Sequence, residues 1–394
     1  MHRKLTNPKY QAKALLVIVY LGFISLGLPD TAFGVTWPFM RLELGSPVTY
    51  AGIIAFITTM LSATAAFCSG PVIKRFGSGK LLVFCGFLTG TALMMTSFLS
   101  SFWMLVVLAI PLGIGAGSID SGLNYYVASH YESRHMNWLH GCWGIGATVG
   151  PAIVTALIGL GLSWRAGYAT LSGIQLTLAL LFLYTLPLWT LPGGKITSDS
   201  AQQTAEDGNA KKDFRFWTSA SMFFIYGGME MSMGLWGYQL MVNVHEVNPN
   251  TAGFFVSCYW GGLMFGRFLT GFISDRIGNR LLIQTSTAGA VIGGLTLIFC
   301  TSQYVALAAL VWTGFSLAAF YPSMMHETPH RFDKPTTRTL MGFQSGAGAL
   351  GFGLYPPLVG LVAARTTFGI LPYVVVAHGL LLFIMRIVID RGRK

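Results

Sequence analysis

Long apolar runs alternate with short polar connections along the whole chain. Each run holds about 20 residues or more, which as a helix is enough to cross ~30 Å of hydrocarbon. The pattern therefore predicts an all-α membrane protein with twelve transmembrane helices, at roughly residues 14–40, 49–73, 80–99, 102–129, 138–162, 166–191, 215–242, 251–273, 281–301, 303–326, 339–363 and 368–388. We expect the first run to be a retained helix, because it has an interior acid and no small-residue cleavage site follows it.

One polar stretch interrupts this pattern in the middle of the chain. Residues 193–214 read GGKITSDSAQQTAEDGNAKKDF, which is polar and poor in aromatic residues. Such a composition is typical of a disordered or loosely helical linker. We therefore expect a six-helix bundle over 1–192, a cytoplasmic linker over 193–214 and a second six-helix bundle over 215–394.

The composition supports membrane insertion and argues against a soluble enzyme. Hydrophobic residues make up 53% of the chain and charged residues 10%, whereas soluble domains carry about 25% charged residues. The net charge of +11 does not indicate a nucleic-acid partner, because the basic residues stand singly between apolar runs. We find no Walker A loop, HExxH, G-x-S-x-G or His/Cys cluster, so we expect no enzyme activity, cofactor or metal. The five cysteines fall inside apolar runs and are expected to be buried.

The basic residues predict how the chain is oriented. With a cytoplasmic N-terminus, 21 of the 25 Lys and Arg residues lie on the cytoplasmic side, three lie on the other side, and Arg267 lies inside a run. Cytoplasmic loops are enriched in Lys and Arg. Both termini are therefore expected in the cytoplasm. We expect the protein in the plasma membrane, which in a bacterium is the inner membrane.

The two halves of the chain repeat each other at an offset of 201 residues. The matches are Gly70, Arg75 and Gly77 with Gly271, Arg276 and Gly278, Gly113 with Gly314, and Gly141, Gly150 and Gly159 with Gly342, Gly351 and Gly360. Parallel six-helix repeats of this kind occur in one architecture of secondary transporters, with the substrate site near the membrane midplane. Channels and membrane enzymes can also be duplicated, so the repeat favours a transporter without requiring one.

The connection between the eighth and ninth runs carries a recognisable motif. Gly271-Phe-Ile-Ser-Asp275-Arg276-Ile-Gly278-Asn-Arg280 resembles the loop signature of the major facilitator superfamily, G-x-x-x-D-[RK]-x-G-[RK]. The first copy, from Gly70 to Lys80, has Lys74 where that family usually has an acid. The resemblance implies the major facilitator fold, alternating access and a gating role for the loop residues Gly70, Arg75, Gly77, Gly271, Asp275, Arg276 and Gly278.

Three acids lie inside the predicted spans, where ionisable residues are costly and mark function by default. Asp30 and Glu230 occupy matching places in the first and seventh runs, at an offset of 200, and Asp120 lies in the fourth. The alternative to a functional role is a structural acid that accepts a hydrogen bond from a local hydroxyl such as that of Thr31. Both Asp30 and Glu230 are far from the span ends, which argues against snorkelling to the headgroups.

The segment Gly117-Ser-Ile-Asp120-Ser-Gly-Leu-Asn124, with Asn137-Trp-Leu-His140-Gly-Cys-Trp143 after it, resembles the fucose-permease-like sugar branch of that superfamily. The resemblance implies that the acids of the first and fourth helices take part in sugar binding and proton coupling. We expect Asp30, Asp120 and His140 to take part in proton coupling, because a neutral histidine pKa also suits proton exchange. Histidines near span ends, His326 and His378, are expected to be structural.

A sugar site also needs aromatic faces and hydroxyl partners. The side chains that we expect to bind the solute are Glu230, Trp37, Asn124, Trp143, Trp260, Tyr321 and Gln344. The alternative for the aromatic ones is helix packing, because aromatic residues fill bundle cores in any case. Arg267 is expected to snorkel to the cytoplasmic headgroups, with a contact to Asp275 or a neighbouring helix as the second interpretation.

These observations favour a monomeric secondary transporter that couples a sugar or sugar-like solute to a proton, although Na⁺ stays open as the coupling ion. The alternative is a proton-coupled efflux antiporter for amphipathic drugs. Gly146-Ala-Thr-Val-Gly150-Pro151 resembles part of the antiporter signature, but Ala152 replaces the glycine pair that follows it there. A third hypothesis is a non-transporting membrane receptor, which would tolerate neutral replacement of the buried acids.

Overall fold

A computed structural model describes residues 8–47, 50–190 and 213–391 of the 394-residue chain. Within these ranges the chain is almost entirely helical and contains no strand. The all-α prediction is therefore confirmed. The predicted linker over 193–214 lies outside the described residues except for its last two positions.

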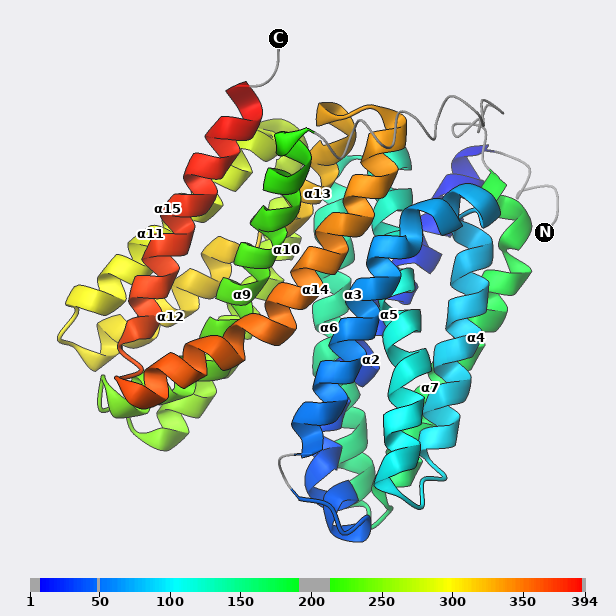
Figure 1. Ribbon diagram of the computed structural model, residues 1–394, viewed down its shortest axis with the longest axis horizontal. Coiled ribbons are helices and arrows are strands. Elements are labelled where there is room, and N and C mark those ends of the chain that lie inside the picture. Colours follow the sequence, from blue (N-terminus) through cyan, green and yellow to red (C-terminus); the bar gives the residue numbers. More distant parts are fainter. Residues whose placement is uncertain (1–7, 48–49, 191–212, 392–394) are drawn as a thin grey trace. The chain divides into compact units, whose positions relative to one another are not determined.

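The helices follow the apolar runs closely (Figure 1). The first half of the chain forms α2 (Pro8–Glu43), α3 (Tyr50–Phe76), α4 (Ser78–Thr96), α5 (Phe102–His130), α6 (Ser133–Gly159), α7 (Trp164–Tyr184) and the short 3-10 helix η1 (Leu186–Thr190). The second half forms α9 (Phe214–Asn243), α10 (Pro249–Ile277), α11 (Asn279–Phe299), α12 (Gln303–Leu317), α13 (Phe320–Arg331), α14 (Lys334–Arg365) and α15 (Ile370–Arg391).

The tenth run departs from the prediction of one continuous helix. It is divided into α12 and α13, with Ala318 and Ala319 in a turn between them. The cause is Pro322, which has no N–H to donate to the carbonyl of Ala318 and whose ring crowds that carbonyl. The sequence shows this proline, but we had not expected it to interrupt the span.

Ten helical stretches of the described chain are long and apolar enough to cross a membrane, counting α12 and α13 as one stretch. The two remaining expected spans, α9 and α10, are not in that set, but their lengths of 30 and 29 residues match the prediction. Taken together, the described helices are consistent with the twelve expected spans.

The described chain divides into two compact units. Unit 1 comprises the residues up to His130 and 142–190, and unit 2 comprises 131–141 and 213–391. The first residues of α6 thus belong with unit 2. In unit 1, α3 packs on α5 and α4 packs on both α5 and α7. In unit 2, α14 packs on α9, α10 packs on α12, and α11 packs on α12 and α15.

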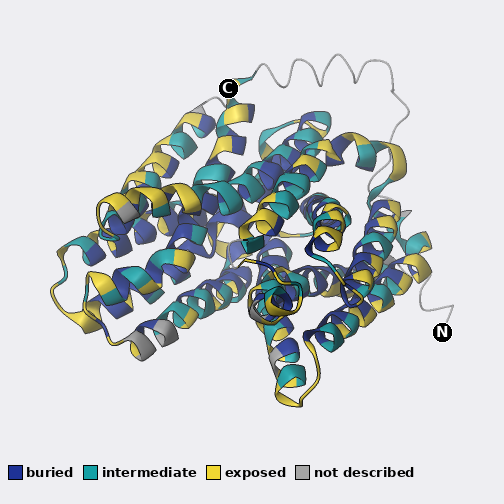
Figure 2. Cartoon of the chain, turned by 60° about the horizontal axis from the view of Figure 1, so that its bottom comes forward, coloured by how far each residue is buried: buried dark blue, intermediate teal, exposed yellow. Residues whose placement is uncertain are grey.

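Buried and exposed residues lie on opposite sides of the individual helices (Figure 2). Large apolar side chains are among the most exposed, such as Trp103 at 70%, Phe299 at 77% and Tyr304 at 84%. Apolar surface of this extent suits contact with lipid. Cys85 and Cys142 are buried as expected, whereas Cys68 is exposed, which corrects the prediction for that cysteine.

Glycines bring two pairs of helices into close contact. A Cβ on Gly146 or Gly150 of α6 would lie 2.0 Å from the carbonyl oxygen of Ile24 or Leu28 in α2. The repeat-related Gly351 of α14 approaches α9 in the same way, 2.2 Å from a carbonyl oxygen. The glycines of the antiporter-like segment thus have a packing role, as small residues do at close helix contacts.

The two motif loops share one backbone feature. Gly77 and Gly278 have positive φ angles of 79° and 84° and directly precede α4 and α11. Glycine adopts this conformation without a steric penalty. The tight turn expected at both copies of the motif is therefore present.

Candidate functional site

Asp30 lies in the middle of α2, with its side chain exposed at the surface of unit 1. Its Oδ2 accepts a hydrogen bond of 3.1 Å from the indole Nε1 of Trp143 in α6. The neighbouring Thr31 does not satisfy Asp30, because its hydroxyl donates to the carbonyl of Ala147 at 2.6 Å. The carboxylate is thus held by one neutral donor and stays accessible.

Asp120 lies on α5, half-buried, one helical turn before Asn124. The Asn124 amide donates to Oδ1 of Asp120 at 3.1 Å, and Asn124 itself is completely buried. The i,i+4 spacing puts both side chains on one face of the helix, as the sequence predicted.

Glu230 has very different surroundings from its repeat-related counterpart Asp30. Its carboxylate is buried and accepts hydrogen bonds from the hydroxyl of Tyr226 and, at 3.0 Å, from the Nη2 of Arg267 in α10. The preferred prediction for Arg267 was wrong: only 4% of this residue is exposed, so it does not snorkel. A cation so deeply buried needs a countercharge, and Glu230 of the neighbouring helix α9 supplies it.

Tyrosines surround this ion pair within unit 2. The hydroxyl of Tyr226 also lies 2.9 Å from the carbonyl oxygen of Leu317, the last residue of α12, and Tyr259 donates to the backbone carbonyl of Glu230 at 2.8 Å. The ring of Tyr226 stacks on Phe320 at 4.9 Å between ring centroids. Apart from the i,i+4 spacing of Tyr226 and Glu230, the sequence gave no sign of this cluster, because its members come from four helices, α9, α10, α12 and α13.

Two of the predicted residues meet beside this cluster. The rings of His140 and Tyr321 lie 4.9 Å apart in an edge-to-face arrangement, and both side chains are buried in unit 2. Phe223 contacts the same tyrosine, with 4.6 Å between the ring centroids. His140 is therefore buried within unit 2.

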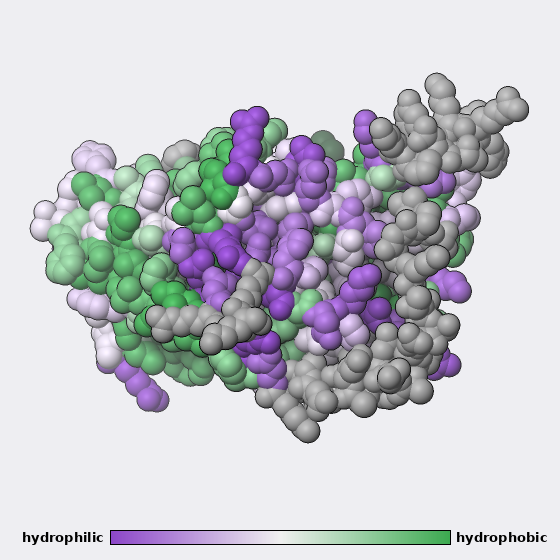
Figure 3. Space-filling view, turned by 90° about the horizontal axis from the view of Figure 1, so that it is seen from above, coloured by the Kyte–Doolittle hydropathy of each residue, from purple (hydrophilic) through white to green (hydrophobic). Residues whose placement is uncertain are grey.

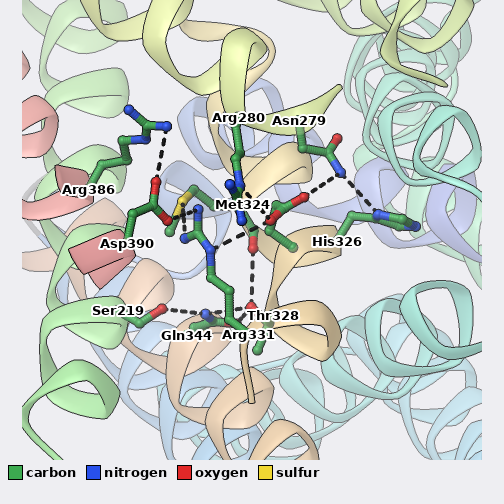
Figure 4. Close-up of polar contacts among 11 residues, drawn as sticks. Ser219, Asn279, Arg280, Met324, His326, Thr328, Arg331, Gln344, Arg386 and Asp390 are labelled. Atoms are coloured by element: carbon green, nitrogen blue, oxygen red, sulfur yellow. Dashed lines mark hydrogen bonds and ion pairs between the residues drawn. The ribbon is translucent and has the colours of Figure 1, made fainter. Parts of the chain in front are cut away.

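The remaining predicted solute-binding residues are engaged elsewhere. Trp37 packs in an apolar cluster with Phe33 and Phe102, and Trp260 lies against the backbone of Gly234. Gln344 is fully buried in a polar triad, where its Nε2 lies 2.8 Å from Ser219 Oγ and 2.9 Å from Thr328 Oγ1 (Figure 4). For these three side chains the surroundings in the structure are those of a helix core.

The motif residues of the second loop lie in unit 2 beside the start of α6. Asp275 is exposed and accepts a hydrogen bond of 3.3 Å from the backbone N–H of Arg134, and its carboxylate forms an ion pair with the Nε of the same arginine, also at 3.3 Å. Gly271 leaves room for Trp138, because a Cβ there would lie 2.1 Å from the indole nitrogen. Arg75 and Arg276 are exposed. The gating role of these residues stays a prediction.

A network of ion pairs at the same end of unit 2 was not expected. Arg331 pairs with Glu327 at 3.6 Å and with Asp390 at 3.2 Å, and Asp390 also pairs with Arg386 at 3.0 Å (Figure 4). Figure 3 looks onto this end of the helices and shows hydrophilic side chains gathered between hydrophobic flanks. The network joins α13 to α15, and it extends to α11 through Arg280, 4.0 Å from Glu327.

A helical membrane protein with a duplicated sequence and acids inside its spans fits the class of secondary transporters. The profile of the Major Facilitator Superfamily matches residues 19–238 and 218–394, which together include nearly the whole chain. The chain belongs to this superfamily, and it is a transporter rather than an enzyme.

Known relatives include sugar transporters. The Glucose/mannose transporter GlcP of Bacillus subtilis is 22% identical over 313 residues, which cover 77% of each chain. The fold is similar to that of the E. coli Fucose:proton symporter FucP, with a TM-score of 0.77, 14% identity and coverage of 95% of this chain and 98% of that one. The proton:xylose symporter XylE, bound to 6-bromo-6-deoxy-D-glucose, gives a TM-score of 0.78 at 12% identity, with 98% and 97% covered.

Proposed function

We propose that the protein is a proton-coupled symporter of a sugar or a sugar-like small solute and works by alternating access. The observation that carries the proposal is the accessible Asp30 carboxylate in the middle of α2, held only by the Trp143 indole among the hydrogen bonds described above. An acid at that depth can take up and release a proton, because ionisable side chains inside spans mark proton and ion pathways.

Proton coupling requires that protonation change the relative free energies of the two facing states. Asp30 and Asp120 are the two acids of unit 1 that we assign to this task. Trp143 donates a hydrogen bond to Asp30, and Asn124 donates one to Asp120, so both of these donors are neutral side chains. Both acids can therefore respond to the proton gradient.

The sugar part of the proposal is supported by the transporters that resemble this chain, whose names specify glucose or mannose, fucose and xylose. The amide of Asn124 and the indole of Trp143, which donate to the two acids, are groups of the kind that bind hydroxyl-rich solutes. We place the protein in the plasma membrane as a monomer with cytoplasmic termini, in agreement with the distribution of its basic residues.

The test is uptake into proteoliposomes against a panel of sugars, with a proton gradient, with a sodium gradient and with neither. We expect accumulation only with the proton gradient. Asp30→Asn and Asp120→Asn should abolish accumulation, and at least one of them should keep solute counterflow, because exchange does not require the empty carrier to return. Accumulation by both variants at the level of the parent protein would refute the proton role of these acids.

A further inference from the structure

Three arginines share two carboxylates at one end of α11, α13 and α15 (Figure 4). Arg280 and Arg331 lie 4.0 and 3.6 Å from the same oxygen of Glu327, and Arg331 and Arg386 lie 3.2 and 3.0 Å from the two oxygens of Asp390. We call Arg280, Arg331 and Arg386 the arginine cluster. Three positive charges against two negative ones leave these five side chains with a surplus of one positive charge.

Arg331, at the centre of the cluster, is buried but poorly satisfied by its neighbours. Only 5% of its side chain is exposed. Its Nη1 donates to the sulfur of Met324 at 3.5 Å, and a thioether is a weak acceptor. Its Nε and Nη2 lie at ion-pair distance from Glu327 and Asp390, but neither atom makes a hydrogen bond within the described part of the chain. Buried polar groups normally have hydrogen-bond partners, so Arg331 has donors to spare.

These spare donors suit an oxyanion. Nε and Nη2 belong to one edge of the guanidinium, and such an edge can bind two oxygens of a phosphate or carboxylate at once. The Nε of the neighbouring Arg386 is also buried without a hydrogen-bond acceptor among the described residues. Two adjacent arginines therefore offer N–H groups to a further acceptor, and the surplus charge favours a negative one.

The surface next to the cluster is apolar. Leu281 directly follows Arg280 and is exposed, and so are Ile384 and Val388, which lie two residues before and after Arg386. Exposed apolar side chains of a membrane protein contact acyl chains, so the arginines lie where hydrocarbon meets headgroups. Basic pockets between transmembrane helices on the cytoplasmic side bind anionic headgroups. We expect this end of unit 2 on that side from the distribution of basic residues.

We propose that the arginine cluster binds a phosphate group, and that an anionic phospholipid of the cytoplasmic leaflet supplies it. The phosphate oxygens accept from the spare donors of Arg331 and Arg386, and the phosphate charge balances the surplus positive charge. Nearly half of the Arg280 side chain is exposed, so the headgroup reaches the cluster from α11. A bound lipid thereby links three helices at this end of unit 2. The proposal does not depend on the proposed transport activity.

Lipid binding to the full-length protein in detergent tests the proposal. The probe is phosphatidylglycerol with a fluorophore on one acyl chain, and fluorescence anisotropy gives its dissociation constant. Arg280→Gln and Arg386→Gln should each weaken binding by about tenfold or more, because each loses charge-assisted contacts to the phosphate. Lys80→Gln is the matched control, since it removes one exposed positive charge on the same expected side of the membrane and should leave the dissociation constant unchanged.

Asp390→Asn gives an effect of opposite sign. The Asp390 carboxylate competes with the phosphate for Arg331 and Arg386, so its neutral replacement should tighten binding by about tenfold. Melting temperatures with and without phosphatidylglycerol provide a second readout for variants that lose stability. The lipid should raise the melting temperature of the parent protein and of Asp390→Asn, but not that of Arg386→Gln.

Competition identifies the source of the phosphate. Phosphatidylcholine, whose headgroup has no net charge, should not displace the probe, and inorganic phosphate should displace it no more than sodium chloride of equal ionic strength does. Stronger displacement by inorganic phosphate would overturn the lipid as the source and assign the site to a soluble anion. Binding that is unchanged in both Arg280→Gln and Arg386→Gln, or that weakens equally in Lys80→Gln, overturns the site itself.

Discussion

Individual side chains within the spans have surroundings that the repeat in the sequence does not reveal. Asp30 and Glu230 occupy matching positions, yet one is exposed with a neutral indole donor and the other is buried beside a guanidinium. The partner of Glu230 is the cationic Arg267, whereas the hydrogen bond described for Asp30 comes from a neutral indole. Repeat-related acids can therefore have different tasks in the two units.

Trp143→Phe removes the indole that donates to Asp30. A hydrogen bond to a charged group is worth about 1.5–3 kcal/mol, and 1.36 kcal/mol corresponds to one pH unit. The pH at which proton-driven uptake is half-maximal should shift by about one to two units, since the lost bond acts on the charged form of the acid. Trp138→Phe is the control, because that indole donates to the carbonyl of Phe268 at 3.2 Å. An unchanged pH profile in Trp143→Phe would contradict the assignment of Asp30.

Glu43, at the end of α2, gives a prediction outside the spans. Its hydrogen bond from Arg165, together with one from Trp164, holds the pKa of Glu43 below its ordinary value of 4.5. A depressed pKa in the folded protein means that the pair stabilises above pH 4.5 and that this contribution is lost as the pH falls through the folded value. Glu43→Gln should lower the free energy of unfolding at pH 7 by less than about 1 kcal/mol, because the pair is largely exposed. The thermal midpoint at pH 7 should therefore fall only slightly.

The check for Glu43 is a pair of melting curves at neutral and acidic pH. The difference between Glu43→Gln and the parent protein should shrink once the pH is below 4.5. Glu246→Gln, which removes the same charge from an exposed connecting segment, serves as the control and should not differ from the parent protein at either pH. A constant difference at both pH values would show that Glu43 acts through packing and not through its charge.

At the scale of helices, periodicity and length predicted nearly all of the elements. Each helix spans the bilayer where a run of apolar residues is long enough to cross it. The hydropathy of the individual residues is therefore sufficient to predict the helices. The interruption before Phe320 was missed, because the effect of Pro322 depends on how its own helix is packed. The preferred prediction for Arg267 was snorkelling, and a contact with a neighbouring helix was only the second interpretation. The pair with Glu230 was hard to predict because the two residues are 37 positions apart on different helices.

One signal in the sequence could have identified that pair. An arginine inside a span needs a countercharge, and Glu230 is the acid of the preceding span. No comparable signal exists for the triad of Gln344, Ser219 and Thr328, because hydroxyls and amides are common in helices. Their partnership depends on the packing of α9, α13 and α14, which only the tertiary structure shows.

The close contact between α2 and α6 can be tested by adding one methyl group to a glycine of α6. Gly146→Ala should destabilise unit 1 by about 1–3 kcal/mol, because the added Cβ would lie 2.0 Å from the carbonyl oxygen of Ile24 and the backbone would have to move. Gly173→Ala in α7 is the matched control, since nothing lies within 4 Å of its Cβ position. There the helix propensity of alanine should stabilise slightly.

Thermal melting in detergent, followed by the fraction of protein that stays monodisperse, measures both alanine variants. A Gly146→Ala protein as stable as Gly173→Ala would mean that the two helices can separate without cost. The same comparison in lipid would show whether the bilayer changes the cost of separating them.

At the scale of the whole molecule, the distribution of basic residues predicts the orientation in the membrane. A cysteine introduced between residues 195 and 212 should react only with reagents that reach the cytoplasm, and one between 244 and 250 only with external reagents. The exposed Cys68 must first be replaced, because it would react on its own. External labelling of the 195–212 segment would reverse the proposed orientation.

The buried ion pair of unit 2 also has a consequence for how the protein is made. Glu230 and Arg267 lie on α9 and α10, which leave the ribosome one after the other and are joined by only the short connection 244–248. Either charge alone in the centre of the bilayer costs about 2.5–3.5 kcal/mol, and pairing offsets part of that cost. The translocon therefore receives α9 with an unpaired acid and completes its insertion only with α10, so that a helical hairpin is the unit of biosynthesis in this part of the chain.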